Sequence, residues 1–354
     1  MNFLKQNKKT AYIITAVCVL LVAALIISQA VRPKSIEPLS SENYYLDTTC
    51  TLFVYEYNGS TVNKLSSEDK NAVQKIFDGS WDICRGLDKK LSKTVEVSDV
   101  SRINNAGGQW VEVDSDTLNI ITAGIMYGDL SNGDFDITIG TVTDLWDYHA
   151  DNPKVPEQSV IDEAVSHVGY RQIQIDGNKV RLQDPAAKLD LGGIAKGYVA
   201  DRIAEYMKAQ GVTSGIVNLG GNIVTIGTKP DTEGFKIGIE KPYSGRSENI
   251  GYVYSSNQTI VSSGVYERQF KVDDKIYHHI LSPKTGYPVE TDLDAVSLIG
   301  DFGHSMDADA LSTICLIKGS KEGKEFITGQ GMEAVFCLTK GDIVQTNGFK
   351  LQTN

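Results

Sequence analysis

The segment KLDLGGIAKGYVADRIAEYM, residues 188–207, constrains the fold most, because two glycines join an apolar stretch directly to a helical pattern. We expect a short strand at Leu189–Leu191 that carries Asp190 to its end, followed by a helix after the glycines. Glycine lets the backbone approach a ligand closely, and the first amide groups of a helix attract anions. Lys196 would add a cation. The pattern is typical of a phosphate site, although close packing of a strand on a helix would favour the same glycines.

Both secondary-structure types alternate along the rest of the chain, and no internal repeat is visible. Helical spacing predicts helices at residues 68–91, 116–130, 161–168 and 305–317, the first behind a Ser66-x-x-Asp69 capping pattern. Alternation and turn signals predict strands at 44–57, 172–175, 179–182, between 216 and 261, around Asp273-Asp274, and near 334 and 343. This order favours an α+β fold of mixed, largely antiparallel sheets with packed helices rather than a doubly wound parallel sheet.

Residues 1–31 form an N-terminal segment of a different composition. Three lysines within the first nine residues precede an almost wholly apolar run, Thr10–Val31. A run of about 20 apolar residues can span a bilayer, so we expect a signal-anchor helix in the cell membrane. Ser28-Gln29-Ala30 has the form of a cleavage site, which leaves a cleaved signal peptide as the alternative. Both interpretations place the body of the protein outside the cytoplasm, because the lysines stay inside.

The remainder of the chain reads as a linker and one large, acidic domain. Residues 32–43 contain two prolines with several serines and glutamates, which predicts a linker, and residues 44–354 form the domain. The chain carries a net charge of −11, which becomes −14 once the three N-terminal lysines are set aside. Without a basic patch, nucleic acid is excluded as a partner. A chelated divalent cation would be the natural way to hold a phosphorylated ligand in so acidic a body.

The cysteines of the domain give no sign of a metal cluster. Cys50, Cys84, Cys315 and Cys337 lie far apart and without C-x-x-C spacing, which indicates neither a zinc site nor a dense disulfide framework. Apolar neighbours predict that Cys315 and Cys337 belong to the core.

A candidate metal site comes from the helix predicted at residues 305–317. Positions four apart share one helix face, so the Asp309 carboxylate and the Thr313 hydroxyl can converge on one hard cation, with Ser312 beside them. Oxygen ligands suit Mg²⁺, which keeps water or phosphate oxygens in its other positions. The same residues are also compatible with a structural role in which Asp309 caps the helix and Thr313 packs.

Six motifs in a fixed order give the chain a resemblance to a known family. They are GDFDITIG from Gly133, DLGGIAKGY from Asp190, NLGGNI from Asn218, SSGVYERQF from Ser262, HHILSPKTGYP from His278 and DADALSTICLIKG from Asp307. In this order they resemble the ApbE-type flavin transferases, the FAD:protein FMN transferases. The resemblance covers residues 45–340 and implies a single ApbE-like domain.

The resemblance implies a ligand set for magnesium and another for FAD. The matching Asp309 and Thr313 would bind the metal together with the backbone carbonyl of Gly193, while Ser312 stands where some relatives have Asp. The positions that would line the FAD site are Leu46, Thr94, Asp134, Phe135, Asp136, Asp190, Lys196 and Leu281. One departure is clear, since Asp47 replaces the glycine of the family's Met-Gly-Thr motif.

His279 is the candidate general base. A threonine or serine hydroxyl is a weak nucleophile at neutral pH, and an imidazole can take its proton as it attacks phosphorus. In an extended segment His278 would point the other way. An imidazole bonded only to backbone is the competing interpretation.

The implied reaction is transfer of FMN from FAD to a Thr or Ser of an acceptor protein through a phosphoester bond, with AMP released and Mg²⁺ required. The acceptor would carry an FMN-binding domain, as an electron-transfer protein does. Two alternatives remain open at this stage. One is a magnesium-dependent FAD pyrophosphatase, in which water replaces the hydroxyl, and the other is a non-catalytic, membrane-tethered flavin-binding protein.

Overall fold

A computed structural model describes residues 36–148, 150–245 and 248–353 of the chain. The chain divides into two units, Met1–Glu37 and Pro38–Asn354, of which the second carries all the elements discussed below. The N-terminal segment, residues 1–31, for which a signal peptide or anchor is predicted, lies outside the described residues. Among the helices of the described part, none has the length and apolar character to cross a bilayer.

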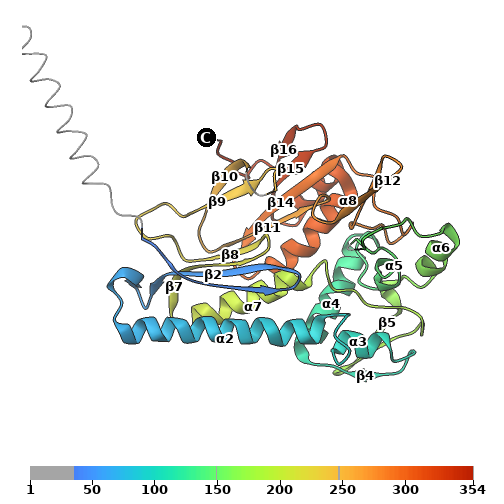
Figure 1. The fold of residues 1–354 in the computed structure, drawn as a ribbon, viewed down its shortest axis with the longest axis horizontal. Coiled ribbons are helices and arrows are strands. Elements are labelled where there is room, and N and C mark those ends of the chain that lie inside the picture. The colour runs from blue at the N-terminus through green and yellow to red at the C-terminus, as the bar shows by residue number, and fades with distance from the viewer. Residues whose placement is uncertain (1–35, 149, 246–247, 354) are drawn as a thin grey trace, which may run out of the picture. The chain divides into compact units, whose positions relative to one another are not determined.

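The second unit is built on a large antiparallel sheet (Figure 1). Its strand order is β1-β2-β7-β8-β11-β14-β15-β16, with β3 paired to β2, and every pairing within it is antiparallel. The strands are β1 (Leu39–Tyr45), β2 (Thr48–Tyr57), β3 (Ser60–Thr61), β7 (Val212–Leu219), β8 (Asn222–Ile226), β11 (Gln258–Gly264), β14 (Leu293–Asp301), β15 (Glu333–Leu338) and β16 (Ile343–Gln345). The predicted α+β class is confirmed.

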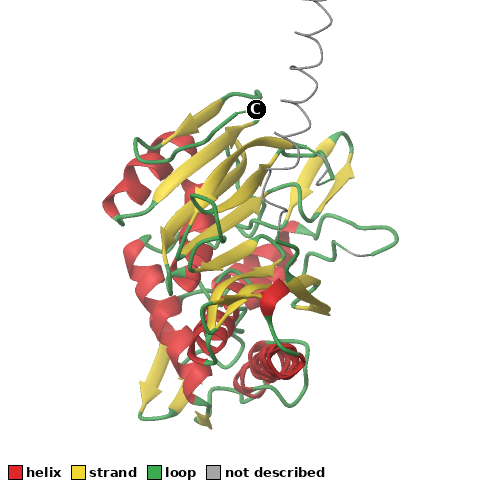
Figure 2. Cartoon of the chain, turned by 90° about the vertical axis from the view of Figure 1, so that its left-hand side faces the viewer, coloured by secondary structure: helices red, strands yellow, loops and turns green. Residues whose placement is uncertain are grey.

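Three long helices cover one face of this sheet (Figure 2). α2 (Ser67–Leu91) packs on β1 and β2, α7 (Ala195–Ala209) on β7 and β8, and α8 (Ser305–Gly329) on β11, β14 and β15. The hairpin of β9 (Phe235–Glu240) and β10 (Asn249–Ser255) packs against apolar side chains of the sheet through a cluster centred on Phe235. The sheet is therefore apolar on both faces, as a sheet covered on both sides must be.

Shorter elements surround the helical layer. They are α3 (Asp99–Asn104), β4 (Val111–Glu112), α4 (Ser115–Leu130), α5 (Gly140–Thr143), α6 (Gln158–Ser166), β5 (Ile173–Asp176), β6 (Lys179–Leu182), β12 (Gln269–Val272), β13 (Lys275–His278) and the 3₁₀ turns Val62–Lys64 and Tyr170–Gln172. β4, β6 and β5 form one small sheet, and β12 pairs with β13 in another.

Local sequence signals located most of these elements correctly. The Ser66 hydroxyl accepts from the Asp69 amide and the Asp69 carboxylate accepts from the Ser66 amide, so the predicted capping box starts α2. The hairpin of β5 and β6 and the pair around Asp273-Asp274 are also present. α8 extends past the predicted end at residue 317 because the chain continues as a second helical stretch after a break at Gly319 (φ 75°).

Three expectations were wrong. Residues 44–57 form a hairpin rather than one strand, since the chain reverses at Leu46 (φ 54°) and Asp47 (φ 57°). Two successive left-handed residues make the tight turn that suits a hairpin, but Asn-Gly or Asp-Gly is its usual signal and Leu-Asp gives none. Residues 39–43, assigned to the linker, therefore belong to β1. Leu189–Leu191 forms no strand. Next to a single bridge between Ile139 and Lys188, the Asp190 amide donates to the Ile137 backbone oxygen, and the Asn104 side chain bonds to the backbone of Leu189.

The position of the two central helices depends on a close approach at Gly197. A Cβ atom there would lie 2.1 Å from the backbone oxygen of Ser305, at the start of α8. One turn further along α7, the Asp201 carboxylate accepts hydrogen bonds from the amides of Ser305 (3.0 Å) and Met306 (2.9 Å). Burial raises the pKa of Asp201 to about 6, against the effect of these two hydrogen bonds. Asp201 thus supplies partners for the first free amides of α8 while Gly197 sets the distance between the helices.

Replacing Gly197 by Ala should destabilise the domain, because the added methyl group meets backbone rather than a movable side chain. We expect the free energy of unfolding to fall by about 1–3 kcal/mol, measured by urea titration with circular dichroism. Gly86→Ala, in the middle of α2 with no atom within 4 Å of the new methyl group, is the matched control and should be neutral or stabilising. Equal effects of the two substitutions would show that the crossing at Gly197 is not tight.

Candidate active site

The glycine turn ahead of α7 brings three of the motifs together. A Cβ atom on Gly193 would lie 3.1 Å from the Phe135 ring and 3.7 Å from the Thr313 hydroxyl oxygen. Phe135 belongs to the GDFDITIG segment and is buried, and Thr313 lies on α8. The predicted positions Gly193, Phe135 and Thr313 therefore meet in one place, although they are far apart in the sequence.

Asp309 occupies the centre of this region. Its side chain is 2% exposed, and its Oδ2 atom accepts a hydrogen bond from the Gly197 amide at 3.0 Å. Oδ1 lies 3.9 Å from Nζ of Lys196, too far for a hydrogen bond but close enough for charge attraction. One carboxylate oxygen is thus committed to the α7 backbone while the other faces the lysine. The Asp309 carboxylate therefore contacts α7 and does not act only as a cap of its own helix.

The Ser312 hydroxyl is engaged within the protein. It donates to the backbone oxygen of Asp309 at 2.7 Å, so the Ser263 hydroxyl, also 2.7 Å away, is the donor in their shared hydrogen bond. Ser263 comes from the SSGVYERQF motif on β11, which this contact ties to α8. Ser312 serves first as a link between these two elements.

The oxygen atoms present fit a magnesium ion better than a softer metal. Throughout the described residues, no three His, Cys, Asp or Glu side chains are grouped to hold a metal ion. A cation here would depend on the Asp309 carboxylate together with the Thr313 hydroxyl and the backbone oxygen of the Gly193 turn. Magnesium binds few protein oxygens and keeps ligand phosphates or water in its remaining positions, so this small all-oxygen set suits it. The four cysteines of the domain are buried and free.

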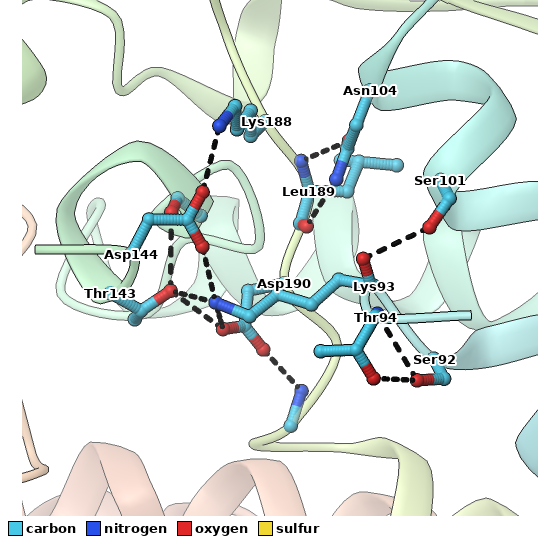
Figure 3. Close-up of polar contacts among 12 residues, drawn as sticks. Ser92, Lys93, Thr94, Ser101, Asn104, Thr143, Asp144, Lys188, Leu189 and Asp190 are labelled. Atoms are coloured by element: carbon cyan, nitrogen blue, oxygen red, sulfur yellow. Dashed lines mark hydrogen bonds and ion pairs between the residues drawn. The ribbon is translucent and has the colours of Figure 1, made fainter. Parts of the chain in front are cut away.

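Asp190 is the centre of a charged network beside the same turn (Figure 3). Its Oδ2 accepts from Nζ of Lys93 (3.0 Å) and from the Thr143 hydroxyl (2.7 Å), and its Oδ1 accepts from the Gly192 amide (2.9 Å). Burial alone would raise the pKa of Asp190, but the charge of Lys93 and these hydrogen bonds outweigh burial and lower it. Asp144 bonds to both Lys93 and Lys188, which extends the network. Asp190 therefore stabilises the glycine turn through its hydrogen bond with the Gly192 amide.

The acids of GDFDITIG have different surroundings. Asp134 pairs with Lys284 (2.7 Å) and with Lys318 of α8 (2.8 Å), and these lysines lower its pKa although burial opposes them. Asp136 is buried and accepts from the amide and hydroxyl of Thr138 and from the amide of Tyr170, while burial raises its pKa. Asp134 thus joins the HHILSPKTGYP motif to α8, whereas Asp136 fixes the fold of its own loop.

The two histidines have different surroundings. His278 ends β13, is buried, and contacts the backbone oxygen of Val289 through Nε2 (3.2 Å). His279 is half-buried, and its Nδ1 lies 3.3 Å from the backbone oxygen of Arg268. Burial and the charges of Arg268 and Lys196 lower the pKa of His279 to about 3, so its imidazole is neutral at physiological pH. His279 therefore lies within range of the charge of Lys196.

The remaining residues predicted to contact the flavin differ in their solvent exposure. Leu46 is half-buried in the turn between β1 and β2, and the neighbouring Thr48 packs against Gly220 of NLGGNI, where a Cβ atom would lie 2.2 Å from its hydroxyl. Thr94 is exposed and hydrogen-bonded to Ser92. Leu281 is buried in a separate aromatic cluster around Trp146. Leu46 and Thr94 thus have surface available for a ligand, while Leu281 has mostly core neighbours.

These contacts link five of the six motifs, and the sixth, NLGGNI, joins SSGVYERQF through the hydrogen bond from the Ser262 amide to the Gly221 backbone oxygen (3.1 Å). Comparison with known proteins agrees with this arrangement, because the model of the ApbE family matches residues 46–336. The chain belongs to the ApbE family.

Curated relatives and solved structures support the assignment over nearly the whole domain. An FAD:protein FMN transferase of Klebsiella pneumoniae is 30% identical over 84% of this chain and 94% of its own length, and one of Treponema pallidum is 29% identical over 83% and 82%. The ApbE protein of Thermotoga maritima superposes with a TM-score of 0.78 at 31% identity, covering 88% of this chain and 97% of its own. The flavinyl transferase ApbE of Pseudomonas stutzeri, in its apo form, gives 0.74 at 27%, covering 88% and 94%.

Several residues at the site of this ApbE-family chain were missed in the sequence. Lys93, Arg268, Lys284 and Lys318 supply the cations that pair with the predicted carboxylates or flank His279. A signal for Lys93 was its position next to the predicted Thr94. Arg268, Lys284 and Lys318 lie inside quoted motifs, so each had a local signal, although nothing in the sequence paired it with a particular carboxylate.

Replacing Asp309 by Asn should abolish magnesium binding while leaving the fold intact, because the amide keeps the volume of the carboxylate and can still accept from Gly197. We expect magnesium to raise the melting temperature of the wild-type domain in the presence of FAD, and to leave that of the variant unchanged. Asp162→Asn, a surface change on α6, is the control and should keep the full magnesium response. A variant that still responds to magnesium would move the metal site away from Asp309.

Proposed function

We propose that this chain is an FAD:protein FMN transferase that attaches FMN through a phosphoester bond to a Thr or Ser of an acceptor protein and releases AMP. Family membership and the names of its relatives support transfer of a flavin to protein. The observation that carries the proposal is a neutral imidazole, His279, within range of the charge of Lys196, which itself lies 3.9 Å from the buried carboxylate of Asp309.

Each side chain has a chemical task in this reaction. Lys196 offers positive charge to the pyrophosphate of FAD. His279 donates its Nδ1 proton to the backbone oxygen of Arg268, which leaves Nε2 unprotonated and able to accept the proton of the attacking hydroxyl. A neutral imidazole needs no prior deprotonation, so the base is ready at physiological pH.

The site also offers ligands for magnesium. Asp309, Thr313 and the backbone oxygen of Gly193 are the residues that would hold it. When bound, the ion would neutralise the negative charge that grows on the leaving phosphate. The hydrogen bond from the Gly197 amide holds the Asp309 carboxylate in position.

His279→Ala should bind FAD but transfer FMN more slowly by about 10²–10⁴-fold, since general-base assistance is lost. The assay combines FAD, magnesium and a protein with an FMN-binding domain, and measures the intact mass of the acceptor together with AMP. Wild type should add one FMN per acceptor and release AMP in equal amount. AMP and free FMN with an unmodified acceptor would instead indicate the FAD pyrophosphatase, and no AMP at all would indicate a flavin carrier.

The pH profile gives a second reading of the same residue. Because the pKa of His279 lies well below its usual 6.5, kcat/KM should not fall through pH 7 to 5.5 from protonation of this group. The deficit of His279→Ala should shrink as pH rises and the hydroxyl needs less help. A wild-type acid limb near 6.5 that disappears in the variant would contradict the low pKa.

We further propose that the domain works outside the cytoplasm, held by the N-terminal segment to the cell membrane or released from it. The lysines ahead of the apolar run in residues 1–31 support this orientation. Protease added to spheroplasts should therefore degrade the domain while a cytoplasmic marker protein survives. Protection of both proteins would place the domain inside.

A further inference from the structure

Arg268 lies next to His279. It immediately precedes β12, and its backbone oxygen accepts from the His279 amide at 3.1 Å as well as facing the imidazole. The guanidinium group lies 3.8 Å from the carboxylate of Asp47, and the side chains are 43% and 73% exposed. The pair is thus loose and open to solvent, and it sits directly beside the candidate base.

Two cations flank His279. After burial, the positive charges of Arg268 and Lys196 lower the pKa of the His279 imidazole. Lys196 already has the Asp309 carboxylate as a neighbour, whereas the guanidinium of Arg268 makes a loose contact with Asp47. A planar guanidinium with several donors is well suited to two oxygens of one phosphate. Arg268 is therefore in place to hold a phosphate of the nucleotide next to the base.

Asp47 is held where it is by its turn. Its backbone is left-handed (φ 57°), a conformation that glycine adopts freely, and glycine is the residue of the family's Met-Gly-Thr motif at this position. Thr48 packs against Gly220, which fixes the far side of the turn. Burial and, after it, the negative charge of Asp47 raise the pKa of Asp88 on α2, so these two carboxylates repel each other. The carboxylate of Asp47 thus has a repulsive neighbour on one side and Arg268 on the other.

We propose that Asp47 competes with the pyrophosphate of FAD for Arg268 and thereby lowers the affinity of this chain for the nucleotide. The proposal rests on the proposed function, because FAD is the ligand. Binding of FAD would move the guanidinium from Asp47 to a phosphate oxygen, and release would return it. A chain with this device binds its nucleotide more weakly than one with glycine at the same position.

The test is equilibrium binding of FAD and of riboflavin to the purified domain in EDTA at low salt, followed by flavin fluorescence. Asp47→Asn keeps the size of the side chain and tolerates the left-handed backbone. It should bind FAD about two- to fivefold more tightly, the range for an exposed ion pair. Riboflavin, which has no phosphate, should bind equally to both proteins. Arg268→Gln should weaken FAD binding, and adding Asp47→Asn to it should give no further gain.

A matched control is Asp273→Asn, an exposed aspartate that is also left-handed (φ 48°), in the turn between β12 and β13. It should leave both affinities unchanged. The proposal is overturned if Asp47→Asn tightens riboflavin as much as FAD, or if its gain persists without Arg268. If wild type fails to bind FAD, the proposed function is overturned as well. If wild type binds FAD and releases AMP but Asp47→Asn leaves FAD affinity unchanged, only this inference is overturned.

Discussion

The hydrogen bond from the Gly197 amide to Asp309 is the contact on which the rest of the site depends. It joins α7 to α8 at the point where glycine lets the two backbones approach, and it fixes the orientation of a buried carboxylate. The amide is one of the first in its helix, so α7 gives up a partial positive charge that would otherwise face a ligand. Because Lys196 precedes Gly197, the same turn of helix positions both the acid and its cation.

Much of the fold could be predicted from local signals. The Ser66 capping box and the Asp176-Gly177-Asn178 turn each specify a backbone conformation within a few residues, so α2 and the hairpin of β5 and β6 were placed correctly. The turn at Leu46-Asp47 could not be predicted, because Leu rarely adopts the left-handed region and the neighbouring Thr48 packs against the distant Gly220. The break at Gly319 is similar, since the chain resumes a helix on the far side of it.

Some residues of the site could likewise be predicted from local sequence, whereas others depend on the tertiary fold. Asp309 and Thr313 belong to one helix, so their spacing alone indicates a shared face. The partners of Asp134 and Asp190 come from segments with no sequence proximity, namely Lys318 and Lys93. A lysine in an acidic protein has many candidate partners, and only the tertiary fold selects one. The resemblance supplied the carboxylates because they recur as motifs, but the choice of counter-charges followed from the packing of this chain.

The place of β1 in the sheet has a mechanical meaning. β1 is the outermost strand on its side and directly follows the boundary at Pro38, and its pairing with β2 begins at Leu39 and ends at the Leu46 turn. A force that pulls the chain ahead of Pro38 away from the sheet would break the hydrogen bonds between β1 and β2 one after another, beginning at Leu39. The first part of the domain to yield under tension would be this strand, and the peeling would run straight to the turn that borders the site. A pulling force on the chain ahead of Pro38 would therefore displace the turn at Asp47 before it separated the helices.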